Sequence, residues 1–177
     1  MAKIYGTDAL RYTLIQHGSV YKDIKIEMAD FKTGKLLANK IWNAGRYILT
    51  KKIYRELNNN LKISENNSLI ITKLEETIGH IKRSLETYDF SGYAHLIRNF
   101  FWNDFCAVYL ENTKKCESLE TYKILYDTYL NILKLFHPIM PFITEHIYQI
   151  FKKKIEEKNI SFSYDFKDSI MLDNSFL

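Results

Sequence analysis

One segment of the chain carries side chains suited to binding nucleic acid. Between positions 37 and 51 the apolar residues fall on one side of a helical wheel, and amide, cationic and aromatic side chains fill the other side. Lysine and arginine neutralise phosphates, asparagine bonds to base edges, and tyrosine or arginine planes stack on unpaired bases. The candidate RNA-binding residues on this polar side are Asn39, Lys40, Asn43, Arg46, Tyr47 and Lys51.

These residues also have plainer explanations. Arg46 lies at the edge of the apolar arc, where it could pair with Asp104 or another carboxylate of a neighbouring helix. Lys52 and Arg55 would extend the polar side, but exposed helices carry cations for other reasons too. The chain has 25 basic and 21 acidic side chains, a formal charge of +4, which permits a nucleic-acid partner without requiring one.

Other reactive side chains do not form a recognisable site. His137, Glu145 and His146 lack the spacing of metal ligands on one helical face. Cys106 and Cys116 form no Cys-x-x-Cys pair, which predicts reduced thiols and no zinc ribbon or disulfide framework. A bundle enzyme built on inward-facing carboxylates would need Glu-x-x-His pairs, and the sequence has none. We therefore predict no catalytic, cofactor-binding or metal residue in this chain.

The elements that must position the candidate residues are helices. Six Gly and two Pro in 177 residues leave few chain breakers. Apolar residues recur every three or four positions, which predicts an all-α, antiparallel helical bundle of about six helices with a short irregular C-terminal tail. We expect Thr7 to cap the first helix, and Pro141 to open the last. The predicted helices cover residues 7–16, 30–57, 68–88, 91–114, 119–136 and 141–158, with an irregular stretch at 19–27.

Three aromatic or charged positions are expected to serve packing. Trp42 and Trp102 lie beside or within apolar stripes, so we predict that both rings pack in the core. Asp104 lies near the stripe of the 91–114 helix, where a carboxylate needs an Arg, a Lys or backbone N–H groups as its partner. His137 precedes a proline and is expected to end its helix.

Four strings of the sequence stand out: Tyr5–Leu14, Asn39–Ile48, Phe100–Glu111 and Leu135–Glu145. They resemble strings of the class I aminoacyl-tRNA synthetases, and in particular of the valyl family. The first and last are shared loosely with isoleucyl and leucyl relatives, whereas Asn-Lys-x-Trp-Asn-Ala and Phe-Trp-Asn-Asp-Phe-Cys look distinctively valyl. Their order and spacing match that family's helical anticodon-binding domain over most of the chain.

The resemblance implies a tRNA-binding fragment of a larger enzyme. Residues 1–28 would be a connector helix and loop following the catalytic domain, 29–160 the anticodon-binding bundle, and 161–177 an irregular tail. The parent would be a cytoplasmic valine–tRNA ligase using ATP with magnesium, and no cofactor would bind this fragment. No apolar run reaches the length of a membrane span, about 18 residues. A stand-alone helical interaction module, or the same domain of an isoleucyl or leucyl relative, stays open as an alternative.

By itself the chain should not activate valine. Class I catalysis is associated with a His-x-Gly-His type signature and a Lys-Met-Ser-Lys-Ser loop, and neither string occurs here. Valine-dependent exchange of pyrophosphate into ATP by the purified chain should therefore equal the background without enzyme. Exchange above that background would contradict the prediction.

Overall fold

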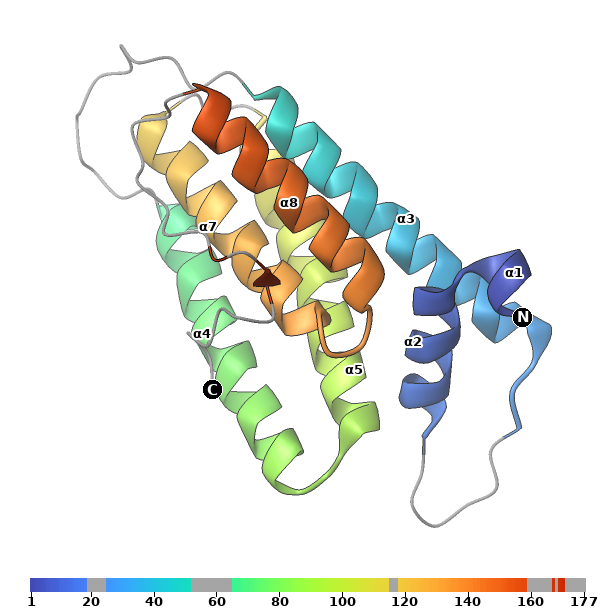
Figure 1. Cartoon of the computed structure of the whole chain (residues 1–177). Helices are drawn as coiled ribbons and strands as arrows, with labels where there is room; N and C mark the ends of the chain where they lie inside the picture. The colour runs from blue at the N-terminus through green and yellow to red at the C-terminus, as the bar shows by residue number, and fades with distance from the viewer. Residues whose placement is uncertain (19–24, 52–64, 115–117, 159–166, 168, 171–177) are drawn as a thin grey trace.

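The computed structural model describes residues 1–18, 25–51, 65–114, 118–158, 167, 169 and 170, and the described residues contain helices and no strand. The elements are α1 (Ala2–Tyr5), α2 (Thr7–His17), α3 (Met28–Thr50), α4 (Glu65–Glu86), α5 (Phe90–Asn99), η1 (Phe100–Tyr109), α6 (Leu110–Asn112), α7 (Leu119–Phe136) and α8 (Pro141–Lys158). Helices α5, η1 and α6 follow one another as one rod. In Figure 1, α4, this rod, α7 and α8 alternate in direction, and α1 and α2 lie against the N-terminal end of α3.

This architecture confirms the predicted all-α antiparallel bundle. The ends of α7 and α8 coincide with their predicted bounds. The side chain of Ser118 accepts a hydrogen bond from the backbone N–H of Thr121 and so caps α7. The helix ends before His137 as expected, but His137 keeps α-helical dihedral angles (φ −56°, ψ −42°), so the predicted reason, displacement by the following proline, was wrong. The predicted C-terminal part of the long helix, residues 52–57, lies outside the described residues, as do 19–24 of the irregular stretch and most of the 161–177 tail.

Two local predictions at the N-terminal end were wrong or incomplete. Thr7 is the first residue of α2, and Gly6, with φ 95°, takes the capping position without any side-chain cap. The short helix α1 was not predicted, because four residues are too few to show helical periodicity.

The predicted 91–114 helix contains a π-helical segment, η1. Its i→i+5 hydrogen bonds widen the turn beyond the 3.6 residues of an α-helix, so positions four apart stay on one face. Phe101, Phe105 and Tyr109 are all buried. An α-helical repeat would continue the stripe of Phe101 and Phe105 to Val108, but Val108 is 49 % exposed. The π segment thus exchanges Val108 for Tyr109 in the core.

Tyr129 of α7 lies at the centre of the core and contacts three other helices. Its hydroxyl donates to the Ile41 carbonyl of α3 at 2.6 Å. Its ring lies 6.0 Å from that of Phe105 in η1 and 5.3 Å from that of Phe151 in α8. A Cβ built on Gly45 would lie 2.6 Å from the Tyr129 hydroxyl oxygen. A glycine at position 45 therefore allows α3 to approach this ring.

The α7–α8 turn is held by two side chains of α2. The Asp8 carboxylate accepts backbone N–H groups at the start of α8, and the Arg11 guanidinium donates to carbonyls of the turn. Burial raises the pKa of Asp8, although these backbone bonds lower it in part. The bonds join Asp8 to Phe142 N and Ile143 N at 3.2 and 2.7 Å, and Arg11 to Pro138 O and Ile139 O at 3.0 and 3.2 Å.

The packing at Gly45 predicts opposite effects of alanine at two helical glycines. Gly45→Ala should destabilise the protein by about 1–3 kcal/mol, because the new methyl group overlaps Tyr129. Gly79→Ala in α4 meets nothing within 4 Å and should stabilise the protein by about 0.5–1 kcal/mol through helix propensity. Urea unfolding of both variants measures the difference, and equal shifts would show that α3 does not depend on this close approach.

Candidate nucleic-acid interface

The six predicted RNA-binding residues lie on one side of α3, but the structure divides them between two edges. Asn39, Asn43 and Arg46 are exposed. Lys40 and Tyr47 are half-buried, and so is Lys51, the residue that caps the end of α3. On the wheel, Arg46 lies at one end of this polar arc and Lys51 at the other.

The first edge presents its polar groups to solvent. We call Asn39, Asn43 and Arg46 the open edge. Within the described part of the chain, none of the three side chains forms a hydrogen bond or an ion pair. Trp42 adjoins this edge and stacks on His146 of α8, with ring centroids 5.6 Å apart. The open edge thus has free donors and acceptors beside a fixed aromatic pair.

The second edge faces the α5–η1–α6 rod through cations placed on aromatic rings. Lys40 Nζ lies 5.2 Å from the centre of the Trp102 ring, and the Arg98 guanidinium lies 5.7 Å from the same ring. Lys51 Nζ and Lys114 Nζ lie 5.1 and 5.6 Å from the centre of the Tyr47 ring. Such contacts orient a cation without neutralising its charge.

Arg98 and Lys114 were not among the residues predicted from the sequence. Arg98 lies four positions before Trp102, a spacing that brings two side chains together on a helix, so this contact had a local signal. Lys114 approaches Tyr47 only through tertiary packing and had none. Trp42 and Trp102, predicted as core residues, are half-buried and pack against the core from its edge.

Asp104 has the structural role that was predicted for it. Its carboxylate pairs with the ammonium group of Lys73 in α4, so this ion pair joins α4 to η1. The alternative explanation of Arg46, an ion pair with Asp104, is therefore wrong.

The structure also tests whether the described residues could bind a metal ion or carry a reactive thiol. No group of three or more His, Cys, Asp or Glu side chains in this part of the chain could hold a metal ion. Burial raises the pKa of the Cys106 thiol to about 12, so it stays protonated at neutral pH. Cys116 lies outside the described residues.

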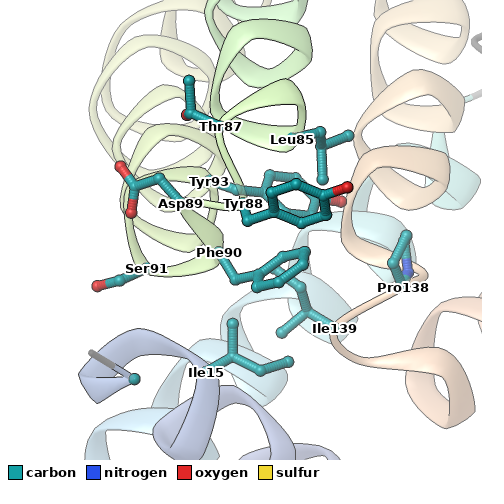
Figure 2. Close-up of a pocket in the computed structure, with 11 residues that line it drawn as sticks. Ile15, Leu85, Thr87, Tyr88, Asp89, Phe90, Ser91, Tyr93, Pro138 and Ile139 are labelled. Carbon is teal, nitrogen blue, oxygen red and sulfur yellow. The ribbon is translucent and has the colours of Figure 1, made fainter. Parts of the chain in front are cut away.

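A cavity of about 910 Å³ is a second candidate site. It lies between the C-terminal end of α2, the α4–α5 turn and the α7–α8 turn, and Figure 2 shows Tyr88 and Phe90 beside it. Its size suits a small ligand. Asp89 is the charged side chain among the described lining residues, however, and a carboxylate repels phosphate. The polar side of α3 therefore remains the candidate nucleic-acid interface.

Comparison with known proteins identifies a family for the chain. Residues 67–176 match the family described as the anticodon-binding domain of tRNA ligase. The chain belongs to this family. The match begins after α3, so it does not test the candidate residues on that helix.

Curated relatives of this anticodon-binding domain are valine–tRNA ligases. The chain is 35 % identical over 157 residues to that of Borrelia garinii subsp. bavariensis, covering 85 % of this chain and 18 % of the relative. It is 38 % identical over 151 residues to that of Thermotoga maritima, covering 82 % and 17 %. The chain thus spans less than a fifth of the length of these relatives, and the resemblance to the valyl family is confirmed.

A solved structure shares the fold. It is the agnB2 LeuRS of Agrobacterium radiobacter K84 in a ternary complex with tRNA and LeuAMS, with a TM-score of 0.62 and 17 % sequence identity. The similarity covers 84 % of this chain and 18 % of that one. At this identity the likeness supports the helical architecture alone.

Tyr88, which lines the cavity, lies in the turn after α4, and its backbone conformation yields a prediction. Tyr88 has a φ of 57°, where glycine is favoured, and the turn closes with Asp89 N to Ser84 O at 2.8 Å and Tyr88 N to Leu85 O at 3.1 Å. Tyr88→Gly should therefore be more stable than Tyr88→Ala by about 1 kcal/mol. Both variants remove the ring, which is 73 % exposed, so comparing their thermal unfolding isolates the backbone effect. Equal stabilities would contradict a strained backbone at this position.

Proposed function

We propose that this domain binds the anticodon arm of a valine-accepting tRNA, using the polar side of α3. The observation that carries the proposal is the open edge, where three side chains that suit base recognition have no partner in the described structure. Asn39 and Arg46 are seven residues apart, about 10 Å along a helix, so the edge can meet neighbouring bases of one loop. Asparagine amides bond to base edges, and the Arg46 guanidinium can bond to a base or stack on it.

We infer that the parent protein joins valine to its tRNA with ATP and magnesium in the cytoplasm. The relatives that are valine–tRNA ligases support the inferred reaction. The domain would hold the anticodon arm so that the acceptor end of the tRNA reaches a catalytic domain of the same polypeptide. Residues 1–28 would be the connector to that domain, although α2 itself packs on the bundle through Asp8 and Arg11. None of the described helices is long and apolar enough to cross a membrane.

Two other functions explain fewer of the observations. A stand-alone interaction module would share the bundle, but it would have no reason to resemble valine–tRNA ligases over most of its length. The leucyl neighbour, at 17 % identity, supports a common fold and gives little support to leucine specificity.

Replacing Arg46 by Ala tests the proposal. The variant should bind valine tRNA roughly fivefold more weakly, a loss of about 1 kcal/mol for one polar contact to a base. Its melting temperature should not change, because Arg46 is exposed and pairs with no described carboxylate. Lys82→Ala on α4 removes the same charge from another exposed position and should bind as the wild type does.

Fluorescence anisotropy with valine tRNA, and with the same tRNA altered in its anticodon, measures both affinities. The Arg46→Ala variant should lose most of the preference for the valine anticodon. Unchanged affinity combined with a lowered melting temperature would assign Arg46 to a structural role and overturn the proposal for this residue.

A further inference from the structure

The contact between α3 and the α5–η1–α6 rod carries four cations on two aromatic rings. We call these residues the cationic seam, which consists of Lys40 and Tyr47 on α3, Lys51 at its C-terminal cap, and Arg98, Trp102 and Lys114 on or after the rod. We propose that the cationic seam binds the phosphate backbone of the RNA, and that Arg98 and Lys114 contact phosphates directly. The inference rests on the proposed function, and it assigns base recognition to the open edge alone.

The Trp102 cluster has the charge that phosphate binding requires. Lys40 and Arg98 both lie within 6 Å of the centre of one ring, at 5.2 and 5.7 Å. Neither cation forms an ion pair with a described carboxylate, and the nearby Asp104 is already bound to Lys73. Two like charges that share a ring repel each other, and a bound phosphate would relieve that repulsion.

The Tyr47 cluster repeats the arrangement with a partial countercharge. Lys51 and Lys114 both approach the Tyr47 ring, and Lys114 also bonds to Glu111 at 2.7 Å. Among the described carboxylates, Glu111 is the one that pairs with Lys114. Glu111 is exposed, so its pairing with Lys114 is weak and can yield to a phosphate.

The two clusters follow each other along one line. Lys40 contacts the rod near residues 98 and 102, and Tyr47 contacts the end of the rod near Lys114, so α3 and the rod run in the same direction here. Lys40 and Tyr47 are about 10 Å apart along α3. A strand of RNA laid along this line would meet both clusters.

The same geometry changes the role of Tyr47. Stacking on a base needs a free ring face, and two ammonium groups already lie over this ring. We therefore assign Tyr47 and Trp102 as positioning residues that hold cations, and no longer as stacking platforms. A cation held on a ring keeps its charge and loses side-chain freedom before RNA arrives, which lowers the entropy lost on binding.

The test compares the salt dependence of tRNA binding by charge variants. Arg98→Gln and Lys114→Gln should each lower the slope of log affinity against log salt by about 0.7, the value for one phosphate contact on single-stranded nucleic acid. Both variants should lose affinity equally for valine tRNA and for the tRNA with an altered anticodon. Arg98→Lys keeps the charge and should keep the wild-type slope. Lys82→Gln, the matched control on α4, should change neither quantity.

The outcomes separate this inference from the proposed function. If the wild-type chain does not bind valine tRNA, the proposed function fails. If it binds, and Arg46→Ala loses anticodon preference while Arg98→Gln and Lys114→Gln keep the wild-type slope, only the cationic seam is overturned. Loss of affinity in the seam variants for valine tRNA alone would also overturn it, because phosphate contacts carry no sequence preference.

Discussion

The contact between Tyr129 and the backbone of α3 sets the orientation on which both candidate surfaces depend. The ring reaches α3 because residue 45 has no Cβ, and its hydroxyl satisfies the Ile41 carbonyl. Rings from η1 and α8 pack on the same tyrosine, so one side chain links four elements of the bundle. With Ile41 and Gly45 turned inward, the helical repeat leaves Asn39, Asn43 and Arg46 outward. The open edge is therefore positioned by residues on the opposite side of its own helix.

The π-helical segment η1 orients Trp102, the ring at the centre of one cluster of the cationic seam. Its wider turns keep Phe101, Phe105 and Tyr109 on one buried face. Trp102 then lies beside that face, where its ring can meet Lys40 of α3 while Arg98 approaches it from the preceding turn. π segments are often found at functional sites, and η1 carries Trp102 of the proposed seam.

The sequence predicted those features that local rules decide. Pro141 predicted the start of α8, and periodicity predicted the bundle and the polar side of α3, whereas the predicted cap at Thr7 was wrong. The exchange of Val108 for Tyr109 was not predictable from a 3.6-residue repeat, because the repeat itself changes in η1. The division of the polar side into two edges depends on Lys114, a residue far away in the sequence, and single-chain periodicity contains no information about such a contact.

Cations of the bundle are held in two ways, by ion pairs and by aromatic rings, and the difference bears on the proposed RNA contact. Lys73 is paired with the Asp104 carboxylate, so the α4 side of η1 carries little net charge at that point. Two residues earlier in the chain, Trp102 holds Lys40 and Arg98 through its ring, which orients the cations and leaves their charge in place. An ion pair would have to be broken before a phosphate could bind, whereas a cation on an aromatic ring needs only to turn toward it. The Trp102 cluster could therefore bind a phosphate without first breaking an ion pair, whereas Lys114 would have to exchange Glu111 for the phosphate.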